Sequence, residues 1–95
     1  MIIANVKFET ELTDEQALEI AKERLPLFLD IPGLIQKYYV KNAQPNEWTG
    51  VYIWDSLESM QNFRETDLAK SIPAAYKVKG QPQIEVNNVP MTLRA

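Results

Sequence analysis

Alternating apolar and polar positions predict four β-strands along this chain. The alternation is clearest near the N-terminus, where Ala4, Val6 and Phe8 share one face. Three further segments have strand composition, and a polar stretch over residues 41–48 joins two of them, which predicts a hairpin. The four expected strands are residues 2–8, 34–40, 49–54 and 83–89.

Helical spacing of apolar residues predicts a first helix from about residue 14 to residue 29. Thr13 and Gln16 have the spacing of a capping box, with acidic residues between them where the helix dipole favours negative charge. We expect Pro26 to kink or restart this helix, because proline has no N–H to donate. The stripe expected to be buried comprises Ala17, Ile20, Ala21, Leu25 and Phe28.

A second helix is expected after residues 55–56, either of which can cap it. Pro73 is expected to end or restart this helical region before Tyr76. Residues 80–82 are expected to separate it from the last strand. Between the first helix and the second strand, Pro32 and Gly33 occupy the central positions of a type II turn. The apolar stripe of the second helix comprises Leu57, Met60 and Phe63.

The order βαββαβ predicts an α+β protein with one domain, residues 1–95, folded as a ferredoxin-like plait. In this fold four antiparallel strands form one sheet, and both helices cover the same face. The second and third strands carry large apolar residues on both faces, so the uncovered face is expected to expose an apolar patch. We therefore expect a homodimer formed by sheet-to-sheet packing; the alternative is a mildly apolar face that stays in contact with water.

The chain has 95 residues and contains no cysteine and no histidine. These absences exclude disulfides, thiol nucleophiles, Ser-His-Asp relays, haem held by an axial histidine, and zinc or copper sites built on thiolate or imidazole. We therefore expect no metal and no cofactor. Any chemistry has to use other groups.

The charged residues are scattered rather than clustered. The net charge is −3, and the ten Lys and Arg residues form no basic run, so nucleic acid is not an expected partner. No apolar stretch approaches the roughly 18–20 residues that span a bilayer, and the N-terminal run over residues 1–4 is broken at Asn5. We expect a cytoplasmic protein that does not bind membranes.

Several segments resemble a known family. Residues 31–39 contain Pro-Gly-Leu-x-x-Lys, residues 50–55 are Gly-x-Tyr-x-Trp-Asp, and Glu58-Ser59 and Phe63 follow. Together they resemble the small YdhR-like monooxygenases of the dimeric α+β barrel superfamily, which also includes the antibiotic-biosynthesis monooxygenases. The resemblance covers most of the chain.

The resemblance implies a dimeric α+β barrel, with a small-molecule pocket between the sheet and the helices of each protomer. Some superfamily members are thought to oxygenate polycyclic aromatic compounds without metal or flavin, the substrate anion itself reducing dioxygen. That chemistry needs groups that hold an electron-rich phenol, polarise a carbonyl and help to remove a proton. None of these groups has to be histidine or cysteine.

Lys37 and Asn5 are the candidate catalytic residues. Lys37 lies in the middle of an aromatic strand, so its ammonium either enters the pocket to stabilise an enolate or phenolate, or extends to water or a carboxylate. Asn5 also lies mid-strand, where its amide contacts either the ligand or a neighbouring strand. Both alternatives stay open for each residue.

Five further residues are candidates for substrate binding. Trp54 and Tyr52 share one face of a strand, where they could stack on a planar ligand or fill the dimer core. Arg64 could line the mouth of the pocket or simply face solvent. The full set comprises Tyr39, Tyr52, Trp54, Arg64 and Tyr76.

Two classes of function fit these residues. The first is a cofactor-independent monooxygenase that acts on a small aromatic or polyketide-like compound. The second is a non-catalytic dimer that holds a small apolar ligand, which is favoured by the lack of any group with an obviously tuned pKa. A non-oxidative cyclase or isomerase would use the same pocket.

Overall fold

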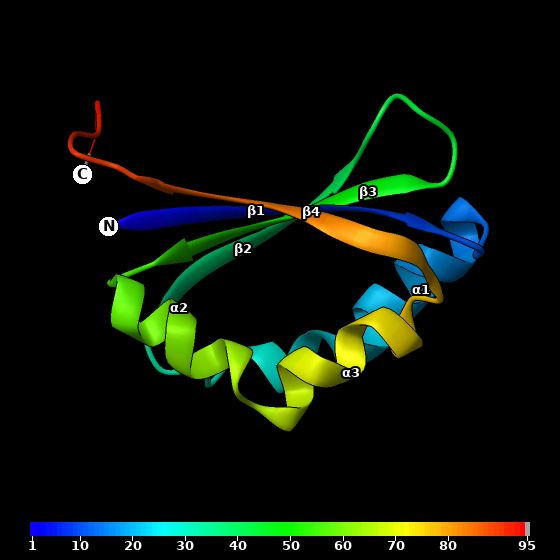
Figure 1. The fold of residues 1–95 in the computed structure, drawn as a ribbon, viewed down its shortest axis with the longest axis horizontal. Helices are drawn as coiled ribbons and strands as arrows, with labels where there is room; N and C mark the ends of the chain where they lie inside the picture. The colour runs from blue at the N-terminus through cyan, green and yellow to red at the C-terminus, as the bar shows by residue number, and fades with distance from the viewer. Residues whose placement is uncertain (95) are drawn as a thin grey trace.

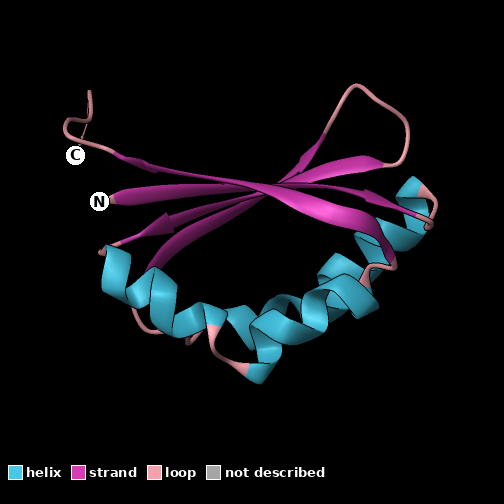
Figure 2. Cartoon of the chain, viewed as in Figure 1, coloured by secondary structure: helices cyan, strands magenta, loops and turns pink. Residues whose placement is uncertain are grey.

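The computed structural model describes residues 1–94 and confirms the predicted α+β class. All helices lie against one face of a four-stranded sheet (Figures 1 and 2). The strand order is β2-β3-β1-β4 with every pairing antiparallel, which is the ferredoxin-like arrangement. Within residues 1–94, none of the helices is long and apolar enough to cross a membrane. The elements are β1 (Ile2–Thr10), α1 (Asp14–Arg24), η1 (Leu25–Phe28), β2 (Leu34–Lys41), β3 (Glu47–Trp54), α2 (Leu57–Arg64), α3 (Asp67–Ala75) and β4 (Val78–Asn88).

The first helical region divides next to Pro26, as the sequence predicts. The Thr13 hydroxyl accepts a hydrogen bond from the Gln16 backbone N–H at 3.1 Å, and the Gln16 side chain accepts one from the Thr13 N–H at 3.0 Å. α1 then gives way to the 3-10 turn η1, which holds Pro26 near its start. Leu25, expected in the buried stripe, is exposed because the helix changes geometry there. The stripe residues that are buried are Ala17, Ala21 and Phe28.

The second helical region breaks earlier than the sequence predicts. Ser56, one of the two predicted caps, accepts from the Ser59 N–H at 3.1 Å and begins α2. A second cap follows, since the Thr66 hydroxyl accepts from the Ala69 N–H at 3.2 Å and begins α3. The helical region does end before Tyr76, as predicted, but Pro73 itself does not end it. Pro73 lies inside α3 near its end, where a missing N–H leaves only one helical carbonyl without its usual partner.

The last strand is longer than predicted. β4 starts at Val78 and continues through Gly80 and Pro82, where the sequence indicated a break. Gly80 has a φ of +69°, and the pairing with β1 shifts register after Lys7. Because β4 is an edge strand, a proline is tolerated there without loss of an interior ladder bond.

Gly33 forms the predicted turn before β2 and ties that turn to α2. Its φ is +81°, as the second central position of a type II turn requires. The Gly33 carbonyl accepts a hydrogen bond from the Asp55 N–H at 2.9 Å. A Cβ at this position would overlap the Ser59 side chain and lie 2.6 Å from Asp55 Oδ1. Glycine is therefore required here by both the backbone and the available space.

The predicted hairpin joins β2 to β3, with β3 starting at Glu47 rather than at residue 49. The Asn42 side chain holds the loop closed. Its Nδ2 donates to Glu47 Oε1 at 2.8 Å, and its Oδ1 accepts from the Thr49 hydroxyl at 2.9 Å. These bonds fix the register in which β2 and β3 pair.

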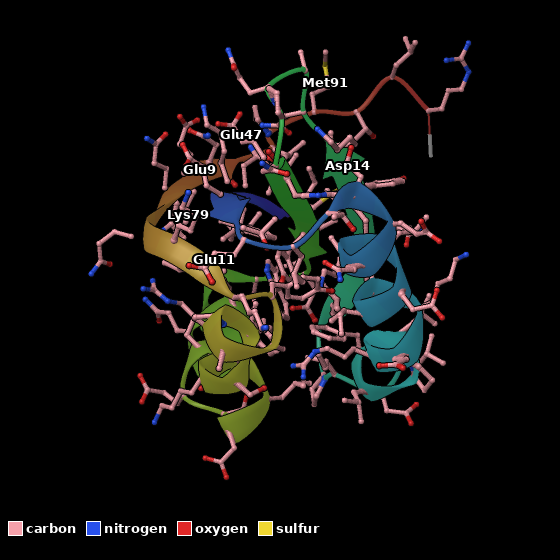
Figure 3. The ribbon with its side chains drawn as sticks, turned by 90° about the vertical axis from the view of Figure 1, so that its right-hand side faces the viewer. Glu9, Glu11, Asp14, Glu47, Lys79 and Met91 are labelled. Atoms are coloured by element: carbon pink, nitrogen blue, oxygen red, sulfur yellow. The ribbon has the colours of Figure 1, made fainter. Side chains whose placement is uncertain are left out.

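The end of the sheet nearest this hairpin is charged (Figure 3). Glu9 and Glu47 are register partners on β1 and β3. Lys7 Nζ lies 3.9 Å from Glu47 Oε1, and Lys41 Nζ lies 3.9 Å from Asp14 Oδ1. Exposed pairs at this distance add little stability, so the fold depends mainly on its apolar core.

The core lies between the sheet and the helices and is largely aromatic. The Phe63 ring centroid lies 5.4 Å from that of Trp54, 6.0 Å from that of Tyr52 and 6.1 Å from that of Phe28. Leu57, predicted to share the buried stripe of Phe63, is instead exposed. The buried cluster comprises Ala4, Phe28, Tyr52, Trp54, Met60 and Phe63.

No element within residues 1–94 covers the opposite face of the sheet (Figure 1). Val51 and Ile53 belong to this open face because they alternate with the buried aromatic residues of β3. On β2, Tyr38 is 54% exposed and Val40 is 40% exposed. Large side chains therefore lie on both faces, as the sequence predicts, while the homodimer stays a prediction.

Candidate functional site

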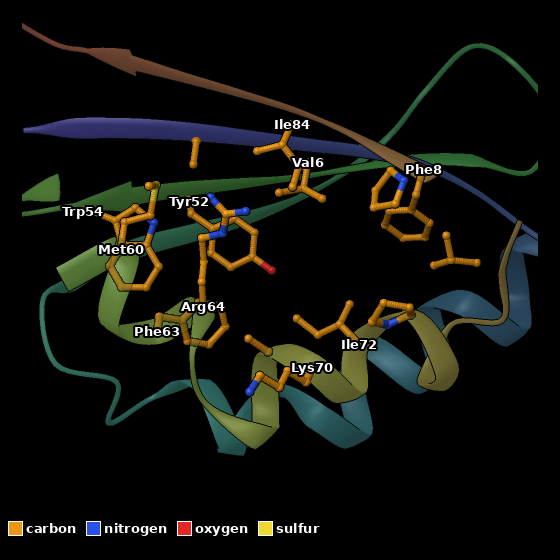
Figure 4. Close-up of a pocket in the computed structure, with 15 residues that line it drawn as sticks. Val6, Phe8, Tyr52, Trp54, Met60, Phe63, Arg64, Lys70, Ile72 and Ile84 are labelled. Carbon is orange, nitrogen blue, oxygen red and sulfur yellow. The ribbon is translucent and has the colours of Figure 1, made fainter. Parts of the chain in front are cut away.

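A cavity of about 230 Å³ lies between the sheet and helices α2 and α3 (Figure 4). Its walls are almost entirely apolar, and neither Asp nor Glu lines it. Arg64 and Lys70, both exposed residues, supply the charged part of the lining. Such a cavity suits the body of a small apolar ligand. Its main apolar walls are Val6, Phe8, Tyr52, Trp54, Met60 and Ile72.

Tyr52 and Trp54 form a stacked aromatic wall of this cavity. They are two residues apart on β3, and their rings are 4° from parallel with centroids 6.1 Å apart. Both lie on the helix side of the sheet, so neither belongs to the open face, which excludes the alternative that they fill a sheet-to-sheet dimer core. Trp54 is 1% exposed, and its buried Nε1 has no hydrogen-bond acceptor.

A smaller cavity of about 40 Å³ adjoins the first one. The two share Val6, Phe8, Tyr52 and Ile72 as lining residues. Lys37, Tyr39 and Tyr76 also line the smaller cavity. A ligand that filled both cavities would have an apolar part in the larger one and would meet an amine and phenols at the smaller one.

Lys37 lies among three aromatic rings. It is the register partner of Tyr52, which places both side chains on the helix face of the sheet. The Lys37 Nζ lies 3.7 Å from the ring centroid of Phe28, 4.4 Å from that of Tyr39 and 4.7 Å from that of Tyr52. Within residues 1–94, no carboxylate forms an ion pair with it. The alternative in which Lys37 pairs with a carboxylate is therefore not found in the described chain.

The surroundings of Lys37 change its protonation. Burial, and secondarily the charge of Arg24, lower the pKa of Lys37 from 10.5 to about 7. At neutral pH about half of such amines carry no proton. A neutral amine accepts a proton, and the adjacent ring faces stabilise the ammonium that results.

The tyrosines around the smaller cavity stay protonated. Burial first, and then the neighbouring Tyr39, raise the pKa of Tyr76 to about 12. Burial, followed by the Tyr39 and Tyr76 phenols, also raises the pKa of Tyr52. Burial raises the pKa of Tyr39 as well. These phenols can therefore donate hydrogen bonds to an anion over the whole neutral range.

Arg24, which the sequence reasoning missed, lines neither cavity, but its charge acts on Lys37 and on the tyrosines of the smaller one. It lies in the last turn of α1, and its Nη2 donates to Ser71 Oγ of α3 at 2.8 Å. Its buried Nε has no acceptor. The signal was present in the helical spacing, since Arg24 follows the buried Ala17 by seven positions and the buried Ala21 by three. A charged residue on a buried stripe needs a partner or a ligand.

The structure brings together most of the predicted site residues. Asn5 is the exception, since it alternates with cavity-lining residues and so belongs to the open face, where Val51 and Glu85 are its register partners. Arg64 lines the cavity but is exposed, so both of its predicted roles, pocket lining and contact with solvent, apply. The residues that surround the two joined cavities are Lys37, Tyr39, Tyr52, Trp54 and Tyr76.

Among residues 1–94, no three acidic side chains gather into a group that could hold a metal ion. Carboxylates are also missing from the lining of both cavities. The chemistry available at the site is therefore that of an amine, phenols and a guanidinium.

No family model and no curated protein sequence matches this chain. Solved structures do match it. SnoaB, a cofactor-independent oxygenase from Streptomyces nogalater, is 9% identical and has a TM-score of 0.78, covering 99% of this chain and 97% of that one. This chain has the same fold.

Two further solved structures agree with this assignment. A monooxygenase from Streptomyces coelicolor in complex with the ligand nanaomycin D is 13% identical, with a TM-score of 0.75 over 99% of this chain and 91% of that one. A protein of unknown function from Nitrosomonas europaea is 15% identical, with a TM-score of 0.80 over 99% and 93% of the two chains. At these identities the likeness concerns the fold, and membership of the YdhR-like group stays a prediction.

Proposed function

We propose that this protein is a monooxygenase that uses neither metal nor flavin and oxidises a small aromatic or polyketide-like compound. The observation that carries the proposal is the Lys37 amine, which has no carboxylate partner in the described chain and lies beside an aromatic-lined cavity. The fold shared with the cofactor-independent oxygenase SnoaB supports the same function. Fold alone hosts many activities, so the site has to supply the argument.

The cavities orient the substrate. Its planar body lies in the larger cavity against Tyr52 and Trp54. Its acidic end lies toward Lys37 in the smaller cavity. The apolar walls exclude water from the reacting carbon.

Lys37 acts as the proton acceptor. The neutral amine takes a proton from an activated CH₂ group or its phenol tautomer, and the ammonium formed lies over the faces of Phe28, Tyr39 and Tyr52. The substrate anion then gives electrons to dioxygen, and a carbon–oxygen bond forms. Lys37 returns its proton to the peroxide, which loses water and leaves a carbonyl. One dioxygen is consumed per substrate, one oxygen atom leaves as water, and the substrate itself is the reductant.

The proposed assembly is a homodimer of the YdhR-like kind, formed through the open face of the sheet. Tyr38, Val40, Val51 and Ile53 would be its apolar centre, with Asn5 in the same interface rather than at the catalytic centre. Sedimentation velocity at micromolar concentration tests this assembly. Val51→Glu should convert a wild-type dimer into a monomer, and a monomeric wild type would contradict the proposal.

Oxygen consumption with an anthrone tests the activity. The protein, treated with a chelator, should consume one dioxygen for each anthraquinone formed. Lys37→Met should abolish this uptake while the far-ultraviolet circular dichroism is preserved, and Lys22→Met on the exposed side of α1 serves as the control. Full activity in folded Lys37→Met, or a requirement for added metal or flavin, would refute the mechanism.

A second candidate function is binding of an apolar ligand without turnover. The nearly complete apolar lining of the larger cavity favours it. Native mass spectrometry would then detect a co-purified ligand, with no oxygen uptake across a panel of phenols. An isomeric product that contains no added oxygen would instead indicate a cyclase or isomerase.

A further inference from the structure

The smaller cavity has room for a molecule of a few atoms and for nothing larger. Its volume is about 40 Å³. One water molecule occupies about 30 Å³ in the liquid, and an apolar cavity that holds benzene measures about 150 Å³. An aromatic ring therefore fits the larger cavity of about 230 Å³ and does not fit the smaller one. The smaller cavity is left for a different guest.

This cavity lies deep in the fold, between the sheet and helices α1 and α3. Ala17 and Ala21 of α1 line it and are only 2% and 7% exposed. Val6, Phe8 and Ile72 add further apolar surface. An ordered water molecule needs two to four polar partners, whereas apolar walls of this kind favour a small uncharged guest.

Lys37 lines the smaller cavity and does not line the larger one. In the proposed reaction this amine returns a proton to the peroxide, so the peroxide has to form within its reach. A substrate ring in the larger cavity can extend its reacting carbon only as far as the junction of the two cavities. Dioxygen would meet that carbon from the side of the smaller cavity. The residues at the junction, which line both cavities, are Val6, Phe8, Tyr52 and Ile72.

The smaller cavity has a second neighbour, a groove of about 170 Å³ between η1 and β2. Lys37 and Tyr39 line both the groove and the smaller cavity. The rim of the groove is apolar, with Leu29 71% exposed and Ile35 59% exposed. A small apolar molecule can therefore approach Lys37 from this side while a substrate fills the larger cavity.

We propose that the smaller cavity is a binding site for dioxygen, approached through the groove beside Lys37 and separate from the cavity that holds the organic substrate. The inference rests on the proposed function, because dioxygen is the second substrate of that reaction. Each substrate then has a site of its own size, a planar ring system in the larger cavity and a diatomic molecule in the smaller one.

Nuclear magnetic resonance under dioxygen pressure tests the site directly. Dioxygen is paramagnetic and speeds the relaxation of the nuclei that it approaches. Without organic substrate, the methyl groups of Ala17 and Ala21 should relax faster under dioxygen than the methyl group of Thr10. Thr10 is the reference because it is 1% exposed and lines neither cavity. Equal enhancement at all three methyl groups would overturn the proposal.

Variants that narrow one cavity at a time locate the effect. Ala21→Val adds bulk to the wall of the smaller cavity and should remove the enhancement at Ala17. Ala17→Val, observed at Ala21, replaces it if Ala21→Val does not fold. Ala69→Val is the matched control, because Ala69 of α3 lines only the larger cavity, and it should leave both enhancements unchanged. Persistence of the enhancement in folded Ala21→Val, or its loss in Ala69→Val alone, would overturn the proposal.

Steady-state kinetics with the anthrone extend the test to turnover. Ala21→Val should raise the KM for dioxygen several-fold, while its kcat at high dioxygen stays near that of the wild type. An unchanged KM for dioxygen in this variant would count against the site.

The result is separable from the proposed oxygenase activity. Oxygen uptake without enhancement at Ala17 and Ala21 would overturn this inference and leave the monooxygenase proposal standing. Enhancement at these methyl groups without any oxygen uptake would do the reverse.

Discussion

Replacement of Lys37 by methionine should remove a specific pH dependence of stability. The structure lowers the pKa of Lys37 from 10.5 to about 7, first by burial and then through Arg24. Between these two values the unfolded chain binds more protons than the folded chain. The free energy of unfolding therefore rises with pH over this window.

The magnitude follows from the size of the shift. For a fully buried amine with this shift, stability would rise by about 2 kcal/mol between pH 7 and pH 9. Lys37 is only half-buried, so solvent screening reduces the expected contribution to about 1 kcal/mol. Methionine keeps most of the apolar stem in place and cannot titrate.

Urea denaturation at pH 7 and pH 9 measures the effect. The wild type should gain about 1 kcal/mol more than Lys37→Met over this interval. Lys22→Met, at an exposed position on α1, should keep the wild-type dependence. Equal pH dependence in the wild type and in Lys37→Met would refute the assignment of a lowered Lys37 pKa, and with it the proton-acceptor role.

Three further predictions concern the fold and the tyrosines. Gly33→Ala should lower the free energy of unfolding by about 3 kcal/mol in urea denaturation, because a strained φ adds to overlap with α2. Gly80→Ala, at a position with open space around it, should lower it by about 1 kcal/mol. Equal losses would contradict the crowding argument. Thr10→Val should lower the free energy of unfolding by about 2 kcal/mol. The reason is that the buried Thr10 hydroxyl donates to the Tyr76 carbonyl and accepts from the Leu12 N–H. Thr10→Ser, which keeps the hydroxyl, should retain most of this stability. Spectrophotometric titration should show two phenols, those of Tyr52 and Tyr76, that ionise only above the usual tyrosine range. Their raised pKa values should make the folded state lose stability above about pH 10. If every tyrosine instead ionised in the usual range, the packing of the smaller cavity would be contradicted.

Much of the fold follows from local pattern. The capping box at Thr13 and the restart at Pro26 depend on residues close together in sequence, and both are present in the structure. The turn at Gly33 has the same local cause. Strand alternation places Tyr52 and Trp54 on one face of β3, but only the packing of the helices shows that this face lines the cavity.

Other features depend on contacts between distant segments. Pro73 lies within a helix because Thr66 caps a separate helix, α3. Pro73 is near the end of α3, where a missing backbone N–H removes little helical hydrogen bonding. β4 continues through Gly80 and Pro82 because an edge position and a register shift accommodate both residues. Neither circumstance is visible in a local window of sequence.

The sequence by itself determined the order of the elements and which side chains share a face of each strand, and it singled out the Lys37 amine as a candidate. Only the tertiary structure decided what that amine can do. It brought Arg24 of α1 close enough to Lys37 of β2 for the charge of one to act on the other. The physical reason is that a pKa depends on lost hydration and on charges across space, and both are set by packing rather than by position along the chain.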